Sequence, residues 1–170
     1  MLRRLCLVVS LVLIAGAWAP ARAQGFFDKV ELSAGYAYTQ FKSYPTSNLN
    51  GLNLSAQYKW REWLGVDADF GGGIGSVGGV SSRVYTYLFG PQVSWPHRVS
   101  PFAHVLVGGS HFSGGGYTSK GIATGFGLGV DWKVKARLSW RVLEIDDVPT
   151  HLGGLTEHSP RVVTGIVYRF

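Results

Sequence analysis

The 170-residue sequence lacks long apolar runs, has a single cysteine, and has charged side chains at only 15% of its positions. No segment reaches the roughly 18 to 20 consecutive apolar residues that a membrane-spanning helix needs. A protein of this composition can therefore cross a membrane only as β-strands. The single cysteine, Cys6, lies near the N-terminus, so the rest of the chain has no disulfide, no thiol nucleophile and no thiolate metal ligand.

The first residues have the order of an export signal. Arg3-Arg4 precedes an apolar run over residues 5–17, and Ala21-Arg22-Ala23 supplies the small residues that a signal peptidase requires. We therefore expect residues 1–23 to be a cleaved signal peptide, with Gln24 as the first mature residue.

The charge and composition of the predicted mature chain narrow the class of protein. Without residues 1–23, 13 basic and 10 acidic residues remain, a formal charge of +3. So small a surplus of positive charge argues against nucleic acid as a partner. Residues 24–170 suit one domain, because no Pro/Ser-rich linker or change of composition divides them. Frequent glycines and aromatic residues favour strands and turns.

Apolar residues alternate with small or polar residues along this domain, which is the period of a strand with two different faces. In residues 52–60, the clearest example, every second residue is Leu, Ala, Tyr or Trp. The pattern predicts eight strands, over residues 30–39, 52–60, 64–71, 85–93, 102–112, 122–132, 136–147 and 161–170. An even number of such strands predicts an all-β fold, an eight-stranded antiparallel up-and-down transmembrane β-barrel with both termini at the short-turn end.

Long loops are expected to alternate with short turns between these strands. The short turns include Arg61-Glu62 and Pro96-His97-Arg98. The long loops are expected over residues 42–50, 71–82, 113–119 and 148–160, of which the two Gly-rich ones, 71–82 and 113–119, are expected to be mobile.

Two strands have local irregularities. Pro91 indicates an edge or a bulge, because proline cannot donate a hydrogen bond to a neighbouring strand. In residues 136–147, Trp140 and Leu143 are both apolar although they have opposite parity, so a β-bulge is expected near Arg141-Val142.

Aromatic residues gather at the strand ends. One ring at the short-turn end is predicted from Trp60, Trp63, Trp95, Trp132 and Trp140, completed by Phe102 and Phe170. A second group toward the loop end contains Tyr36, Tyr38, Tyr85 and Tyr87. Such girdles are typical of the two membrane interfaces. A soluble barrel or sandwich would instead bury its aromatic side chains in mid-strand.

The C-terminal strand supplies a family resemblance. Val162, Thr164, Ile166, Tyr168 and Phe170 are expected to face outward, and Arg161, Val163, Gly165, Val167 and Arg169 inward. With Arg141, Glu144, Asp146 and Gly153-Gly154, this stretch resembles the OmpA-like outer-membrane β-barrel domain over essentially all of the mature sequence. The resemblance implies that Ile166, Tyr168 and Phe170 form a signal for the barrel assembly machinery. It implies no role in binding peptidoglycan, because the sequence stops at the eighth strand.

Charged residues are expected inside the barrel or near its rims. These are Glu31, Lys59, Asp67, Asp69, Arg83, Asp131, Glu144, Asp146, Arg161 and Arg169. An eight-stranded lumen is just wide enough for side chains to fill it, so we expect these charges to pair and largely plug the lumen. A wide diffusion pore of the general porin type is therefore disfavoured. We expect a structural or surface-interaction role through the extracellular loops.

An enzyme is the first alternative. His111 and Ser113 are two residues apart and can face the same side, and Glu157 could orient the imidazole, which is the arrangement that acyl transfer needs. Lipid A deacylases are barrels of similar size with such a His, Ser and Glu. In them Asn follows the serine, whereas Gly114 follows it here. The pattern therefore favours the non-enzymatic interpretation.

A periplasmic lipocalin-like binding barrel is the second alternative. It would need the polar face outside, and the Gly-x-Trp found near the start of lipocalins is missing. No metal or cofactor is expected: His97, His104, His151 and His158 lack metal-ligand spacing, and the Gly-rich segments lack the Lys-Ser/Thr of a phosphate-binding loop. The expected partners are outer-membrane lipid and the barrel assembly machinery. The protein itself is expected to be a monomer. Lys42, Arg83 and Lys120 are either lipopolysaccharide contacts or solvated surface charges.

Overall fold

The computed structural model describes residues 29–41, 47–77, 80–152 and 155–170. The predicted signal peptide, Lys42 and Gly153-Gly154 lie outside the described residues. Within the described ranges, no helix is long and apolar enough to cross a membrane.

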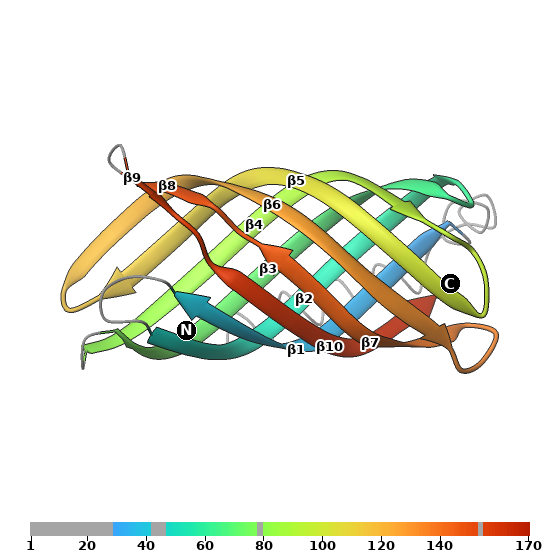
Figure 1. Cartoon of the computed structure of the whole chain (residues 1–170), viewed down its shortest axis with the longest axis horizontal. Coiled ribbons are helices and arrows are strands. Elements are labelled where there is room, and N and C mark those ends of the chain that lie inside the picture. The colour runs from blue at the N-terminus through green and yellow to red at the C-terminus, as the bar shows by residue number, and fades with distance from the viewer. Residues whose placement is uncertain (1–28, 42–46, 78–79, 153–154) are drawn as a thin grey trace, which may run out of the picture.

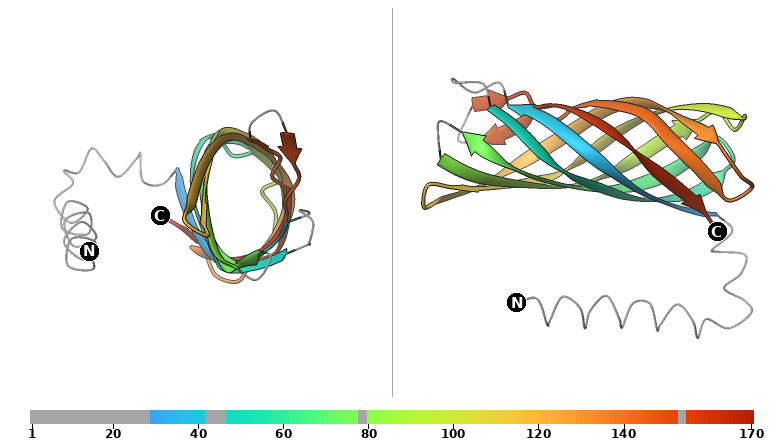
Figure 2. Two further views of the ribbon diagram at one scale, coloured as in Figure 1. Left: turned by 90° about the vertical axis from the view of Figure 1, so that its left-hand side faces the viewer. Right: turned by 90° about the horizontal axis from the view of Figure 1, so that it is seen from below.

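Eight long antiparallel strands close into a barrel (Figure 1). They are β1 (Val30–Phe41), β2 (Ser47–Arg61), β3 (Leu64–Val77), β4 (Val80–Ser94), β5 (Val99–Gly114), β6 (Tyr117–Lys133), β7 (Leu138–Asp147) and β10 (Pro160–Arg169). Each strand pairs with its neighbours in the chain, and β10 pairs with both β7 and β1, so the long strands form a closed ring (Figure 2). The predicted fold class is confirmed. The C-terminus and the short turns lie at one end, on the right of Figure 1.

The two faces of the strands alternate as predicted. In β4, Tyr85, Tyr87 and Phe89 are exposed while Val84 and Leu88 are buried. Ten residues separate Tyr85 from Trp95 on the outer face, and at about 3.3 Å per residue and a tilt of roughly 45° they cover about 23 Å along the barrel axis. This length matches the apolar band of about 25 Å in outer-membrane barrels.

The bulge predicted in β7 is present. Val130 pairs with Leu143 and Asp131 pairs with Arg141, so Val142 is the extra residue. Because of the bulge, Trp140 and Leu143 can both be exposed although they have opposite parity.

Pro91 causes neither an edge nor a bulge, contrary to the prediction. Phe89 pairs with Val107 and Gln92 with His104 in the same register, and the pairing with β5 is interrupted only at Gly90-Pro91. The missing N–H donor of Pro91 therefore interrupts the strand pairing locally without changing its register.

The first Gly-rich segment is not a loop. The prediction of a mobile loop over 71–82 is wrong, because β3 continues to Val77 and β4 begins at Val80. Because glycine has no side chain, this segment shows no alternation of apolar and polar residues. Several of these glycines face the lumen, where larger residues fill the space. A Cβ on Gly73 would lie 3.3 Å from Leu49 Cβ, and a Cβ on Gly75 would also contact the Leu49 side chain.

The other long loops are also shorter than predicted. Strand β2 begins at Ser47 instead of residue 52, and the turn after it falls at Glu62-Trp63, one residue later than expected. Strands β5 and β6 extend to a tight turn at Gly115-Gly116, where both residues have positive φ (59° and 81°). Such backbone angles suit a two-residue hairpin turn. The loop 148–160 contains two short strands, β8 (Thr150–Leu152) and β9 (Leu155–Glu157), and β8 pairs with β6.

Candidate functional site

The inner faces of five strands bring charged residues together in the middle of the barrel. Six of the predicted lumen residues are almost completely buried there: Asp67 and Asp69 on β3, Asp131 on β6, Glu144 and Asp146 on β7, and Arg161 on β10. With Arg141, His104 and Asn53 they form what we call the mid-barrel network. Residues up to 92 positions apart in the sequence are in direct contact within it.

Arg161 joins β10 to β3 and β7. Its Nη1 donates to Asp69 Oδ1 at 2.9 Å, and its Nε donates to Asp146 Oδ2 at 2.8 Å. Asn53 donates its amide to the second oxygen of Asp69. Both carboxylates therefore have buried hydrogen-bond donors, as a buried ion pair requires. Arg161 Nη2 lies 2.8 Å from Asp146 Oδ2 as part of the ion pair but makes no hydrogen bond within the described residues.

Arg141 is a second cationic centre, which the sequence analysis did not assign to the lumen. Its Nε and Nη2 donate to the two oxygens of Asp131 at 2.9 and 3.3 Å, and its Nη1 donates to Glu144 at 2.8 Å. The guanidinium also lies 4.3 Å from the ring centre of Phe102. Phe102 is buried in the lumen, so the prediction that it completes the outer aromatic ring is wrong. The parity of Phe102, His104 and Leu106 on β5 was the signal that could have identified this inward face.

His104 brings β5 into the network. Its Nε2 lies 3.0 Å from Asp146 Oδ1. Among the described residues, His104, Glu144 and Asp146 are the one group whose ligand atoms lie close enough together, within 4.8 Å, to hold a metal ion. Glu144 and Asp146 are already bound to Arg141 and Arg161, however, and these guanidinium groups would repel a metal cation. The geometry therefore favours ion pairing.

Glycines provide the space for these side chains. A Cβ on Gly127 would overlap both Asp146 Oδ1 and His104 Nε2, and a Cβ on Gly71 would lie 2.7 Å from Arg161 Nη1. Glycine at these two positions therefore leaves room for the side chains of the network.

A second charged group, which we call the mouth cluster, lies at the short-turn end of the lumen. Glu31 Oε1 accepts from Arg169 Nε at 2.6 Å and forms an ion pair with Lys59 Nζ at 2.7 Å. Arg169 Nη1 also donates to Ser139 Oγ at 2.9 Å. The predicted inward positions of Glu31, Lys59 and Arg169 agree with these contacts.

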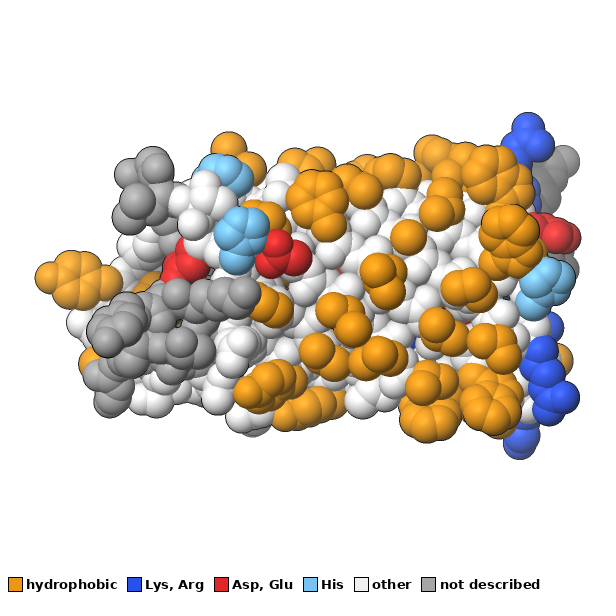
Figure 3. Space-filling model, in the orientation of Figure 1, with side chains coloured by type: hydrophobic (Ala, Val, Ile, Leu, Met, Phe, Trp, Pro, Cys, Tyr) orange, Lys and Arg blue, Asp and Glu red, His pale blue; other side chains and the backbone are white. Residues whose placement is uncertain are grey.

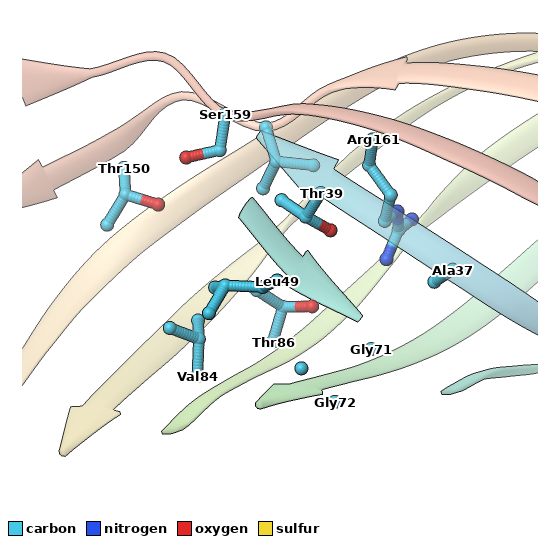
Figure 4. A pocket seen from close by; sticks show the side chains of 12 residues that line it. Ala37, Thr39, Leu49, Gly71, Gly72, Val84, Thr86, Thr150, Ser159 and Arg161 are labelled. Carbon is cyan, nitrogen blue, oxygen red and sulfur yellow. The ribbon is translucent and has the colours of Figure 1, made fainter. Parts of the chain in front are cut away.

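Little space remains on the hairpin side of Arg161. A cavity of about 30 Å³ lies there, between Leu49, Thr86, Ser159 and the guanidinium (Figure 4). Ligand-binding pockets for small molecules usually enclose about 300 to 1,000 Å³, so this cavity is far too small for one.

The outer surface carries the predicted aromatic residues. The five tryptophan side chains are between 47% and 66% exposed, and apolar side chains cover the barrel surface from its middle to the short-turn end in Figure 3. Ile166 and Tyr168 on β10 and Phe170 directly after it are exposed, and the rings of Tyr168 and Phe170 meet edge to face at 5.0 Å.

The residues of the enzymatic alternative do not form a catalytic group. His111 and Ser113 share a face of β5, as predicted, and because Phe112 packs inward this face is the outer one. Glu157 lies on β9. Among these three described residues there is no hydrogen bond, so nothing in the arrangement activates the Ser113 hydroxyl.

Comparisons with known proteins identify the family. The family described as "Outer membrane protein beta-barrel domain" matches residues 9–155 of the chain. No curated protein sequence matches it.

Solved structures with the same fold come from bacterial outer membranes. Neisserial surface protein A (NspA) has a TM-score of 0.68 at 15% identity, covering 84% of this chain and 97% of that one. Ail, the attachment invasion locus protein of Yersinia pestis, has a TM-score of 0.60 at 19% identity, with 83% and 97% covered. The N-terminal β-barrel domain of Pseudomonas aeruginosa OprF has a TM-score of 0.50 at 11% identity, with 82% and 97% covered. At these identities the likeness is one of fold.

Proposed function

Since the chain belongs to the outer membrane protein β-barrel domain family and is located in the bacterial outer membrane, we propose that it is a monomeric barrel with a plugged lumen that acts as a structural and surface-interaction protein. The mid-barrel network carries this proposal. Two buried guanidinium groups bind carboxylates from β3, β6 and β7, so the lumen is crossed by side chains held in place by ion pairs. Water and solutes would have to break these pairs to pass.

The interaction surface is proposed to be the hairpin end, which faces outward when the short turns face the periplasm. Beyond the apolar band, the outer faces of β4, β5 and β6 carry Arg83, His111, Ser113 and Lys120. The β5–β6 hairpin ends in Tyr117, which is 81% exposed. Tyrosine and arginine are frequent anchors in protein interfaces. Arg83 and Lys120 lie just above the band, and we propose that they contact lipopolysaccharide phosphates.

Conductance across planar bilayers tests the plug. We expect no steady conductance from the wild-type barrel, and a measurable one when Arg141 and Arg161 are both replaced by serine. A matched variant with Arg83→Ser and Lys120→Ser removes the same charge from the outside and is expected to remain closed. A large wild-type conductance that the lumen variant does not alter would contradict the proposal.

We also propose that Ile166, Tyr168 and Phe170 are recognised during assembly. Deleting Phe170 removes one interfacial ring and the hydrogen bond from its N–H to the Val30 carbonyl, and the ring contributes at most about 1.5–3 kcal/mol. We expect the shortened protein to be degraded or retained in the periplasm of cells, yet to fold from urea into detergent micelles nearly as well as wild type. Normal insertion in cells would contradict recognition of the terminal ring.

A further inference from the structure

Positive charge is distributed unevenly between the two ends of the barrel. Of the twelve lysines and arginines in the described part of the chain, eight lie in the short turns or at the adjoining strand ends, and the others are Arg83, Lys120, Arg141 and Arg161. Three described acidic residues accompany these eight, Glu31, Glu62 and Asp131, and Asp131 is already paired with Arg141 in the lumen. Figure 3 shows Lys and Arg side chains gathered at this end, on the right.

Four of these cations line the mouth of the lumen. A recess of about 500 Å³ is bounded by Lys59, Arg98, Lys133 and Arg169, with Glu31 and Glu62. Glu31 is shared between Lys59 and Arg169. Among the described residues, neither Arg98 nor Lys133 has an ion-pair partner. Their two charges therefore remain available to an anion.

The backbone holds Arg98 and Lys133 side by side. The N–H of Lys133 donates to the carbonyl of Arg98 at 2.9 Å. The β4–β5 turn that carries Arg98 is itself fixed, because the N–H of Trp95 donates to Pro101 and the Ser100 hydroxyl donates to the Trp95 carbonyl at 2.6 Å. An anion that binds here would need little reorganisation of the turn, which favours affinity.

An apolar groove runs from this mouth onto the outer surface. This open groove has a volume of about 770 Å³ between Trp63, Val93, Trp95 and Pro101, and it shares Glu62 and Pro96 with the mouth recess. The groove lies where tryptophan rings meet the membrane interface. One ligand could therefore place an anionic group between Arg98 and Lys133 and an apolar chain between Trp63 and Trp95.

We propose that this end of the barrel holds a phospholipid with a net negative headgroup, such as phosphatidylglycerol, from the periplasmic leaflet. Its phosphodiester binds Arg98 and Lys133, and one acyl chain lies in the groove between Trp63 and Trp95. Charge complementarity at the mouth and the apolar groove joined to it select an amphiphile over a soluble anion. The bound lipid anchors the barrel at its periplasmic end, opposite the surface hairpins.

Native mass spectrometry of the detergent-solubilised barrel tests the site, with phosphatidylglycerol or phosphatidylethanolamine added. Wild type is expected to retain phosphatidylglycerol about tenfold or more strongly than phosphatidylethanolamine, and Arg98→Gln with Lys133→Gln to lose most of this preference, because each basic side chain near an anionic lipid contributes to binding. Lys135→Gln with Arg137→Gln removes the same charge from the same end but lines neither recess. This control is expected to bind as wild type does. The heat-dependent gel shift of a closed barrel confirms that each variant is folded.

Other outcomes would overturn the proposal. Equal losses in the two charge variants would mean that the end attracts anions only through its overall charge. Displacement of the lipid by glycerol phosphate at equal concentration would mean a site for a soluble anion. Unchanged retention after Trp63→Ala with Trp95→Ala would mean that the acyl chain does not occupy the groove.

Discussion

The mid-barrel network and the mouth cluster use the same chemistry in different surroundings. In the middle, the side chains of Arg161 and Asp69 are only 4% and 1% exposed, and the guanidinium binds two carboxylates. At the mouth, Arg169 and Glu31 are 21% and 10% exposed, and one carboxylate serves two cations. Water can replace a lost partner at the mouth but not in the middle. The same ion pair should therefore matter much more to stability at one depth than at the other.

The largest effect is expected from removing the buried cation. Arg161→Ala leaves Asp69 and Asp146 without their main partner, and breaking a buried ion pair in this way costs about 3–5 kcal/mol. Urea unfolding in lipid vesicles measures the loss. Restoring neutrality with Asp69→Asn and Asp146→Asn in the same chain should recover part of it. No recovery would show that the packing of Arg161, and not its charge, is what stabilises the barrel.

The outer face at the same depth provides the next test. Leu54 lies outside, next to Ser55, whose cross-strand partner is Asp69. Leu54→Arg should cost about 2–4 kcal/mol, because a charge near the bilayer midplane loses its hydration. Ile74→Arg is the matched control near the hairpin end of β3 and should cost about 0–1 kcal/mol. Equal losses of stability in the two variants would mean that the apolar band extends toward the hairpin end as far as Ile74.

Gly127 tests how tightly the network is packed. Gly127→Ala adds one methyl group that overlaps His104 and Asp146, and overpacking of this kind costs about 1–3 kcal/mol. Gly116→Ala is a comparison outside the lumen, where a Cβ meets nothing within 4 Å and only the positive φ of 81° opposes it. If Gly127→Ala leaves the urea midpoint unchanged, the His104–Asp146 contact has room to move.

The smallest effect is expected at the mouth. Arg169→Gln leaves Glu31 paired with Lys59 and open to water, so we expect a loss of about 1 kcal/mol or less. The same urea titration as for Arg161→Ala gives a direct comparison. A loss as large as that of Arg161→Ala would show that burial does not distinguish the two groups.

The sequence determined the strands, their two faces and the bulge, because each of these depends only on the order of apolar and polar side chains. Thus Trp140 and Leu143 were enough to predict the extra residue in β7, which the pairing of Asp131 with Arg141 confirms. The glycine segments were misinterpreted as loops for the same reason, since a residue without a side chain carries no alternation. Their strand conformation follows from the hydrogen bonds of neighbouring strands and, in the first segment, from Leu49, which fills the space beside Gly73 and Gly75.

Tertiary structure decided which charges meet. The parity of a residue predicts the face on which it lies, but it does not predict the partner across the lumen, because this depends on the register and tilt of strands far apart in the sequence. Arg161 reaches Asp69 from the opposite end of the domain. Arg141 and Glu144 can both face the lumen, although they have opposite parity, because the bulge at Val142 lies between them. His104 and Phe102 likewise acquire their roles from closure of the ring. The sequence by itself therefore determined a barrel with charges inside, and the closed structure determined how those charges pair.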